Sequence, residues 1–412
     1  MNDVFRSHNV VVRSVPANDR TRWVVTFDNY SIGHGFDRPG FGEDFLRQNG
    51  VSAIHIMGRR EDWYQYPEMD TALAAAKSAL SGAGTVVTYG SSMGAYAAIR
   101  FADRVGAHAA LAISPQYSID NAKVPTETRW PQDSRRINFL PSLDGKISCS
   151  IIPLVIYDPT GLDEIHARLI ARDTPIKTLP IRYSGHPSTT FLAETGLLSK
   201  TLFDLLTRSL DVDALRREIR IKRHESTVYL SQLAHASRKG RADRSLRIAR
   251  HAVDLDPTSP LALTNLAKLL SAQNKHDEAL ELHSKAAVLT NNYFTYMIGY
   301  ADALAAAGRY TEALSYARRV TKVTEAGVLA NIRGWHGLIA RAAGEIEEAE
   351  AAFKTAIDLD PGSESYPKML RDLRVQTTQS SFKRLAIRLG YLVFQGQRRL
   401  RSSYSSKRRR ES

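Results

Sequence analysis

The stretch Val86–Ala102, VVTYGSSMGAYAAIRFA, joins an apolar run to an alanine-rich run through two serines enclosed by glycines. Thr85–Tyr89 has the β-branched and aromatic residues of a buried strand, and Ala95–Ala102 has the pattern of a helix with small side chains facing a sheet. The pentapeptide from Gly90 to Gly94 matches G-x-S-x-G, with Ser92 at its centre. A sharp strand-to-helix turn needs small flanking residues and presents the central hydroxyl at the top of the sheet. This context predicts that Ser92 is a nucleophile.

The first half of the chain alternates strand and helix patterns. The candidate strands are Val10–Val15, Trp23–Phe27, Ala53–Met57, Thr85–Tyr89, Ala109–Ile113, Pro153–Tyr157 and Thr178–Tyr183. The candidate helices are Phe41–Asn49, Met69–Ser81, Met93–Asp103, Asp163–Arg172 and Phe191–Ser209. Several strands are apolar on both faces, which is typical of a parallel sheet covered by helices. We therefore expect an α/β domain over residues 1–210, with a mostly parallel sheet and helices on both faces.

The pentapeptide from Gly90 to Gly94, between a strand and a helix, resembles the nucleophile elbow of the α/β-hydrolase superfamily. The resemblance covers about residues 1–210. It implies the chain order Ser, acid, His, with each partner just after a later strand. His186, in a glycine-histidine loop after the last strand, is the base that it implies. Asp158 and Asp163 both follow the preceding strand. Position favours Asp163 as the acid, and the unused aspartate would cap the next helix.

An oxyanion hole needs two N–H donors aimed at the developing negative charge. The resemblance implies that the first donor is the backbone N–H of the residue after the nucleophile, Met93. The second comes from the loop after Trp23–Phe27, where Asn29 and Tyr30 are the candidates.

Aromatic residues gather in two loops that follow candidate strands. Trp63, Tyr64 and Tyr66 follow one strand, and Trp130 lies in a long polar loop after Ala109–Ile113. Loops at the carboxyl ends of parallel strands line the crevice of such a sheet. These aromatics therefore form either a rim for a sugar or aromatic acyl substrate, or a cover over the sheet edge.

The second half of the chain repeats itself. Ser259–Asn292 aligns without a gap on Tyr293–Ala326, so that small and apolar residues recur 34 residues apart: Ala267 with Ala301, Leu270 with Leu304, and Ala279 with Ala313. This period resembles the tetratricopeptide repeat, a helix pair with small residues where the helices cross. We expect a connecting helix at 211–225, about four repeats over 226–365 and a solenoid that binds a protein partner.

The last residues form a basic tail, expected to span 366–412. Phe382–Ser412 carries ten Lys or Arg and one acid, and thus +9 of the net charge of +13. Such a tail can stay solvated or lie on an anionic membrane surface, and no accompanying motif favours nucleic acid.

The remaining composition points to a reducing compartment. Cys149 is the one cysteine, so no disulfide can form within the chain. The N-terminus lacks a secretory pattern and no apolar run is long enough to span a bilayer, which predicts a cytoplasmic protein, in contact with the inner membrane face if the tail binds lipid. The sequence shows no metal-ligand cluster or phosphate-cradling loop, so we expect no metal and no cofactor.

Together these patterns predict a serine hydrolase of the esterase type that acts on a small-molecule or glycan acyl ester. An acyltransferase with a sugar or other hydroxyl acceptor would use the same acyl-enzyme. The third alternative is a non-catalytic interaction protein with a degenerate hydrolase fold.

Overall fold

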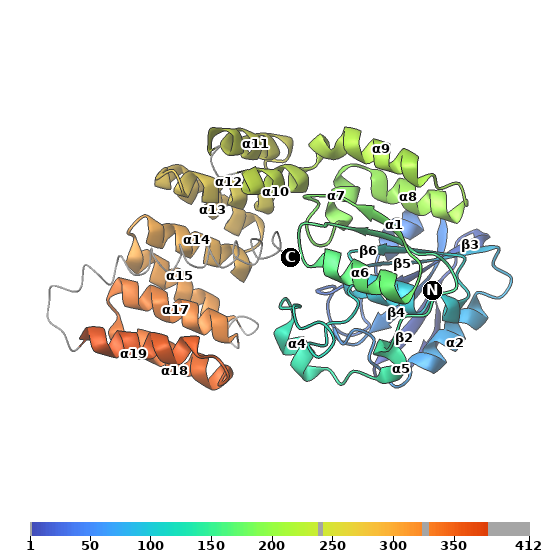
Figure 1. Cartoon of the computed structure of the whole chain (residues 1–412), viewed down its shortest axis with the longest axis horizontal. Helices are drawn as coiled ribbons and strands as arrows, with labels where there is room; N and C mark the ends of the chain where they lie inside the picture. The colour runs from blue at the N-terminus through green and yellow to red at the C-terminus, as the bar shows by residue number, and fades with distance from the viewer. Residues whose placement is uncertain (1, 238–241, 324–328, 378–412) are drawn as a thin grey trace. The chain divides into compact units, whose positions relative to one another are not determined.

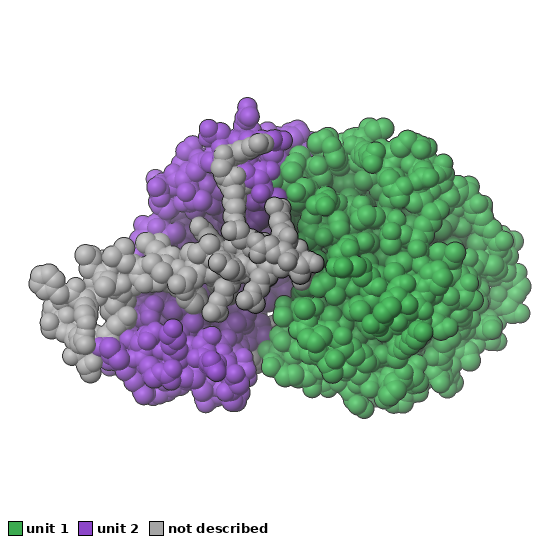
Figure 2. All heavy atoms as spheres, in the orientation of Figure 1, with its two compact units in different colours: residues 1–233 green, residues 234–412 purple. Residues whose placement is uncertain are grey.

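The computed structural model describes residues 2–237, 242–323 and 329–377 (Figure 1). The chain falls into two compact units, Met1–Leu233 and Ala234–Ser412 (Figure 2). The boundary lies later than the expected ends of the α/β domain at 210 and of the connecting helix at 225. The expected connecting helix is α9 (Val212–Lys222), which belongs to the first unit. Its side chains Val212, Leu215 and Ile219 are buried, whereas Ile221 is exposed.

The first unit is built on one eight-stranded sheet in the order β1-β2-β4-β3-β5-β6-β7-β8. The pairs from β4 through β8 are parallel, whereas β1 and β2 pair antiparallel at one edge. The strands are β1 (Asn2–Arg6), β2 (Val10–Val15), β3 (Asp19–Phe27), β4 (Val51–Gly58), β5 (Thr85–Ser91), β6 (Ala109–Ile113), β7 (Leu154–Tyr157) and β8 (Lys177–Pro180). The sheet was predicted as mostly parallel, and the structure has a mixed sheet with helices in which five of the seven strand pairs are parallel. The charged edge strand β1 was not predicted.

Helices cover both faces of this sheet. On β5, Thr88 donates to Ala98 O of α3 at 2.8 Å, while the neighbouring Tyr89 points to the other face and contacts Phe41 with ring centroids 5.2 Å apart. The helices and 3₁₀ turns of this unit are α1 (Glu43–Gln48), α2 (Met69–Ala79), α3 (Met93–Arg100), η1 (Asp103–Val105), α4 (Pro131–Arg136), α5 (Pro141–Asp144), α6 (Asp163–Asp173), α7 (Thr189–Glu194), α8 (Leu197–Leu206), α9 and η2 (Arg223–Glu225). The single helix expected at Phe191–Ser209 is two helices, because Gly196 at φ 69° ends one and begins the other.

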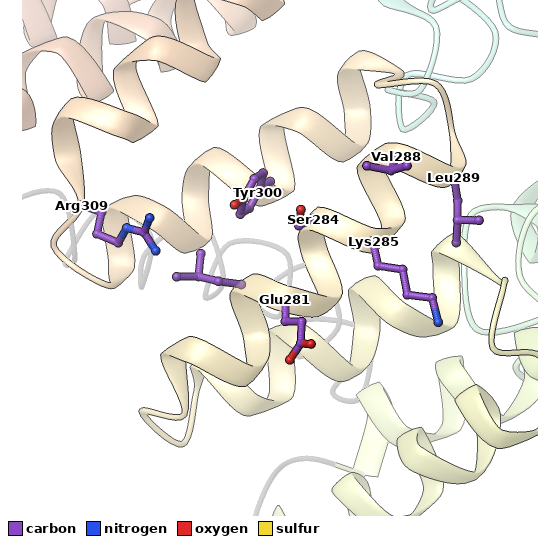
Figure 3. A pocket seen from close by; sticks show the side chains of 8 residues that line it. Glu281, Ser284, Lys285, Val288, Leu289, Tyr300 and Arg309 are labelled. Carbon is purple, nitrogen blue, oxygen red and sulfur yellow. The ribbon is translucent and has the colours of Figure 1, made fainter.

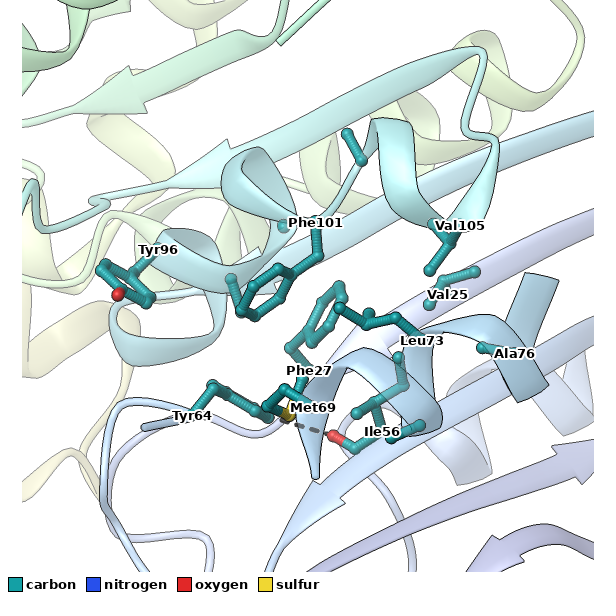
Figure 4. Packing of buried hydrophobic residues seen from close by; sticks show 14 of the residues in the cluster. Val25, Phe27, Ile56, Tyr64, Met69, Leu73, Ala76, Tyr96, Phe101 and Val105 are labelled. Atoms are coloured by element: carbon teal, nitrogen blue, oxygen red, sulfur yellow. Dashed lines mark hydrogen bonds between the residues drawn. The ribbon is translucent and has the colours of Figure 1, made fainter. Parts of the chain in front are cut away.

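The main core lies between the sheet and the helices α2 and α3 (Figure 4). Phe27 of β3 sits between Tyr64 and Phe101, with ring centroids 5.5 and 5.9 Å away. Met69 and Leu73 of α2 complete this packing. The aromatic core fixes the carboxyl end of β3 beside the start of α3, where the candidate nucleophile lies.

The described part of the second unit consists of helices and the turns between them. The boundary between the two units falls within α10 (Thr227–Ser237). The helices that follow α10 are α11 (Ala242–Leu255), α12 (Pro260–Ser271), α13 (His276–Leu289), α14 (Phe294–Ala306), α15 (Tyr310–Lys322), α17 (Ala330–Ala343), α18 (Ile346–Leu359) and α19 (Ser365–Thr377). Small residues lie where they cross: a Cβ added at Gly337 would stand 2.5 Å from the Phe353 ring.

The helical packing also extends beyond the expected end of the repeats at 365. Leu370 and Leu373 of α19 are buried in the same core as α17 and α18, so the tail does not begin at 366. The basic segment Phe382–Ser412, with its membrane and nucleic-acid alternatives, lies outside the described residues. Within the described ranges, no helix is long and apolar enough to cross a membrane.

Candidate active site

Ser92 occupies a strained turn between β5 and α3. Its backbone has φ 54° and ψ −117°, a conformation that costs a non-glycine residue about 1–3 kcal/mol. A Cβ at Gly90 would lie 2.2 Å from the backbone of Gly94, and one at Gly94 would lie 2.4 Å from Phe27 O. Both glycines are therefore needed for the turn to fit against β3. The turn holds the Ser92 side chain at the carboxyl end of the central strands.

Three side chains from separate elements meet at this point. Ser92 Oγ lies 3.0 Å from His186 Nε2. His186 Nδ1 lies 2.8 Å from Asp163 Oδ2 and 3.0 Å from Asp163 Oδ1. The Asp163 side chain is 3% exposed and that of His186 is 23% exposed, so the imidazole is accessible to solvent while the carboxylate is not.

The partners of His186 fix its tautomer. A carboxylate only accepts hydrogen bonds, so Nδ1 carries the proton that Asp163 accepts. In the neutral ring Nε2 is then unprotonated and accepts from the Ser92 hydroxyl. This is the arrangement in which a histidine can remove the proton of a serine.

Asp158 has a different position from Asp163. It accepts from Thr160 N at 2.9 Å and from Thr160 Oγ1 at 2.7 Å, closing a turn after β7. Its second oxygen accepts from Gly185 N at 2.8 Å. Asp158 therefore holds the loop that carries His186 and does not cap α6, whose N-cap position is Leu162.

A residue that follows β6 holds the same loop from a second side. Ser188 N donates to Ser114 Oγ at 3.1 Å, and Ser188 Oγ lies 2.8 Å from Ser184 Oγ. All three serines are fully buried. The backbone on either side of His186 is thus fixed from both neighbouring strand ends, which limits the movement of the imidazole.

Gln116, which was not predicted as a site residue, also reaches Ser92. Its Nε2 lies 3.2 Å from Ser92 Oγ and 3.2 Å from Ser114 O, and its Oε1 accepts from Trp63 Nε1 at 3.2 Å. Because an indole N–H can only donate, the amide must present its NH₂ group to Ser92. Ser92 Oγ then accepts from Gln116 and donates to His186. The sequence signal that could have indicated Gln116 is its position shortly after β6, the strand that pairs with β5.

A charged group stands behind the acid. Arg129 Nη1 lies 2.7 Å from Asp163 Oδ1, and Arg129 Nη2 lies 2.6 Å from Glu127 Oε2. Burial acts to raise the pKa of Asp163, but its hydrogen bonds and charge contacts with His186 and Arg129 outweigh burial and leave the pKa lowered. Asp163 is therefore an ionised carboxylate at neutral pH.

The aromatic residues expected at the rim have divided roles. Tyr64 and Tyr66 lie in the core: the Tyr64 hydroxyl donates to Ile56 O at 3.2 Å and the Tyr66 hydroxyl donates to Arg60 O at 2.6 Å. Of the two alternatives for these residues, a substrate rim or a cover over the sheet, burial favours the cover for both tyrosines, because the backbone supplies partners for their hydroxyls.

The two tryptophans instead contact side chains that reach Ser92: Trp63 contacts Gln116 and Trp130 contacts His186. Trp63 is fully buried beneath the site and holds Gln116. Trp130 is partly buried; its ring lies edge to face against His186, with centroids 5.7 Å apart, and against Trp63 at 5.3 Å. Of the four predicted rim aromatics, Trp130 alone is placed to border the site.

The candidate oxyanion donors come from the start of α3 and from the loop after β3. Met93 is the first residue of α3, where backbone N–H groups have no partner within the helix. Asn29 and Tyr30 follow the Phe27–Asp28 backbone, which is packed against Gly94. Asn29 Nδ2 donates to Tyr30 O at 3.0 Å, and the Tyr30 hydroxyl donates to Asp133 at 3.1 Å. These contacts fix the loop beside the nucleophile.

The second unit has an open hollow of about 620 Å³, lined by α13, by α14 and by Arg309, which directly precedes α15 (Figure 3). Its lining combines apolar and charged side chains. They are Leu280, Glu281, Ser284, Lys285, Val288, Leu289, Tyr300 and Arg309. Val288 is 66% exposed and its neighbour Leu289 is 42% exposed, so two adjacent aliphatic side chains of α13 reach solvent at this hollow.

Comparisons with known proteins identify the second unit. Family models of the tetratricopeptide repeat match residues 248–281 and 301–364. The prediction of tetratricopeptide repeats in the C-terminal part of the chain is confirmed.

Solved structures similar to this chain include MamA (41-end) from Desulfovibrio magneticus RS-1, at 20% identity over 42% of this chain and 92% of that chain with a TM-score of 0.33. Others are pilF of Pseudomonas aeruginosa, at 19% identity over 41% and 74% with a TM-score of 0.34, and a thermophilic tetratricopeptide-repeat protein of Thermus thermophilus, at 14% identity over 46% and 98% with a TM-score of 0.34. No curated protein matches the chain.

Proposed function

We propose that the N-terminal unit is a serine hydrolase that cleaves an acyl ester through an acyl-enzyme on Ser92. The observation that carries the proposal is the Ser92–His186–Asp163 chain of hydrogen bonds, at 3.0 and 2.8 Å, on a strained elbow. A strained backbone at the end of a central strand is stabilised only by the surrounding structure and is typical of functional sites. A finer assignment to the α/β-hydrolase superfamily is supported by the elbow between strand and helix and by the order Ser, Asp, His along the chain.

The proposed reaction uses each group in turn. His186 Nε2 accepts the hydroxyl proton while Ser92 Oγ attacks the ester carbonyl, and Asp163 stabilises the imidazolium that forms. The Met93 N–H would donate to the carbonyl oxygen as it becomes negative. Collapse breaks the ester bond, and His186 returns the proton to the leaving alcohol. A water or an acceptor hydroxyl then attacks the acyl-enzyme with the same histidine as base, so hydrolysis and acyl transfer share every residue named here.

Fluorophosphonate labelling of the full-length chain tests this proposal. We expect the wild type to label, Ser92→Ala to abolish labelling and His186→Ala to slow it severely. Ser91→Ala is the matched control, because Ser91 is the neighbouring serine and its Oγ is held 2.6 Å from Thr189 Oγ1. Labelling that persists in Ser92→Ala, or a folded wild type that does not label, would refute the assignment.

We also propose that the tetratricopeptide repeats bind a protein partner, since stacked helical repeats present extended binding surfaces. The hollow lined by Lys285 and Val288 is the surface to test. Val288→Asp should weaken binding of a partner captured by the full-length chain and leave Ser92 labelling unchanged. A Val288→Asp protein that retains the partner in full would exclude this surface.

A further inference from the structure

A row of charged and polar groups runs away from the triad into the long loop between β6 and β7. His186 contacts Asp163, Asp163 contacts Arg129, Arg129 contacts Glu127, and Glu127 Oε2 lies 2.8 Å from His166 Nε2. Asp163, Glu127 and His166 are all buried. Burying this many charges is unfavourable unless each is paired, so the row is a built feature of the fold.

The geometry of the row is tightly defined at its far end. His166 Nδ1 accepts from Tyr117 N at 3.0 Å, so Nε2 carries the proton that Glu127 accepts. Glu127 also receives Nε and Nη2 of Arg129, at 3.0 and 2.6 Å, in a two-pronged pair. The guanidinium lies over the Trp130 ring, 4.5 Å from its centroid. Arg129 is therefore held from three sides, with Nη1 aimed at the triad acid.

We propose that Arg129 and Glu127 are positioning residues that set the charge felt by the Asp163–His186 pair, Arg129 opposing protonation of His186 and Glu127 moderating that effect. The inference rests on the proposed function, because its significance depends on His186 acting as a base. Neither residue touches Ser92 in the structure. Both act through Asp163.

The charged groups that face the pair come from two loops. Arg129 contacts Asp163 directly, and Glu127 stands behind it with His166. Asp158, in the loop after β7, accepts a hydrogen bond from Gly185 N. The substitutions proposed at Arg129 and Glu127 leave Asp158 in place. Burial acts to raise the pKa of Glu127, but the hydrogen bonds from His166 and Arg129 outweigh it and lower the pKa to about 2. Both members of the Arg129–Glu127 pair are therefore charged at any pH at which a histidine titrates.

The two charges have opposite consequences for His186. A nearby positive charge disfavours the imidazolium, so removing Arg129 should make His186 protonate at higher pH. A nearby negative charge favours the imidazolium, so removing Glu127 should make His186 protonate at lower pH. A purely structural role predicts no such opposition, because each substitution breaks the same ion pair.

The experiment measures the rate of fluorophosphonate inactivation against pH for the full-length wild type, Arg129→Gln and Glu127→Gln. The inactivation rate should fall at low pH, as His186 becomes protonated, and the midpoint of this fall is the acid limb of the profile. We expect the acid limb to move to higher pH by about one unit in Arg129→Gln and to lower pH by about half a unit in Glu127→Gln. Arg129→Lys is the matched control, since it keeps the charge but loses the two-pronged pair, and its limb should stay near the wild-type position. Circular dichroism establishes that each variant is folded.

Titration of His186 by NMR, assigned with His186→Gln, gives a second readout that needs no activity. Opposite shifts of the His186 titration would support the inference even if the probe does not react, in which case the proposed function alone fails. The inference would be overturned if the acid limb of the pH profile did not move, or moved in the same direction, in folded Arg129→Gln and Glu127→Gln. If the wild type reacted with the probe in that case, the proposed function would still stand.

Discussion

In the N-terminal unit the ends of β5, β6 and β7 bury charged and polar side chains around one serine, whereas the C-terminal unit buries alanine, glycine and leucine where its helices cross. Ser92 has a strained backbone, and Asp163 and Glu127 are buried carboxylates. In the repeats, Gly337 lies against Phe353 in an apolar core.

The difference shows how each unit relates to its surroundings. Buried charge and backbone strain are unfavourable for folding, and they persist where a rigid framework holds the groups in place. The sheet supplies that framework, with residues at the ends of neighbouring strands holding Gly185 and Ser188 on either side of His186. Exposed large apolar side chains are more numerous among the described residues of the repeats than in the first unit, and Val288 and Leu289 are adjacent on α13, which suits recognition of another molecule.

The largest effect should separate the two aspartates. Asp163→Asn removes the carboxylate that stabilises imidazolium and orients His186, and should slow labelling roughly 10³- to 10⁴-fold. Asp158→Asn keeps an oxygen that can accept from Gly185 N, and should slow labelling far less. Rates of fluorophosphonate inactivation measure both. Equal losses in the two variants would mean that Asp163 has no special role in the site.

The next effect compares a glycine in each unit. Gly94→Ala should lower the free energy of unfolding by about 3 kcal/mol, because its Cβ would meet the backbone oxygen of Phe27, which cannot rotate away. Gly337→Ala should cost less, because the Phe353 ring can shift. Urea unfolding followed by circular dichroism measures both.

A reporter for each unit sharpens this comparison. The chain has four tryptophans, and Trp335 is the one in the second unit, so Trp335→Phe makes fluorescence report on the first unit alone. In that background Gly94→Ala should lower the fluorescence midpoint and Gly337→Ala should not. A lowered midpoint in both variants would show that the two units do not unfold independently.

A smaller effect is expected at Gln116. Gln116→Leu removes the N–H that meets Ser92 Oγ and leaves Trp63 Nε1 without its acceptor, and should slow labelling about tenfold. Gln116→Glu keeps the acceptor for Trp63 but presents a carboxylate to the serine as negative charge develops there, so it should be slower still. If Gln116→Glu labels faster than Gln116→Leu, Gln116 only supports Trp63.

The smallest effect concerns the strain at Ser92. Ser92→Gly removes the Cβ from a backbone at φ 54°, and should raise the free energy of unfolding by about 1 kcal/mol. Ser92→Ala keeps the Cβ and should not. The same urea unfolding experiment compares the two inactive variants. Equal stabilities would indicate that the turn is not strained in solution.

The sequence predicted those features that depend on local pattern and chain order. Small flanking residues between a strand and a helix located Ser92, and the order of later strands located His186 and favoured Asp163, whose side chains are within hydrogen-bond distance in the structure. The 34-residue period located the repeats, because each helix pair must bury the same positions against its neighbours.

The rest depends on tertiary contacts that no local pattern encodes. Arg129 and Glu127 lie in a long polar loop without periodicity, and only the folded chain brings them to Asp163. Tyr64 and Tyr66 have the composition of a substrate rim, yet backbone oxygens accept their hydroxyls within the core. The short charged edge strand Asn2–Arg6 lacks the apolar alternation that would have indicated it.

The central claim is that Ser92 is an activated nucleophile, and locating the probe on the chain tests it most directly. The folded wild type is reacted with a fluorophosphonate and digested with trypsin, and the peptide spanning 78–100 is sequenced by mass spectrometry, which distinguishes Ser91 from Ser92. We expect one adduct, on Ser92, and no adduct when the chain is denatured before the probe is added. An adduct on Ser91, equal reaction of the denatured chain, or no adduct on the folded protein would contradict the account.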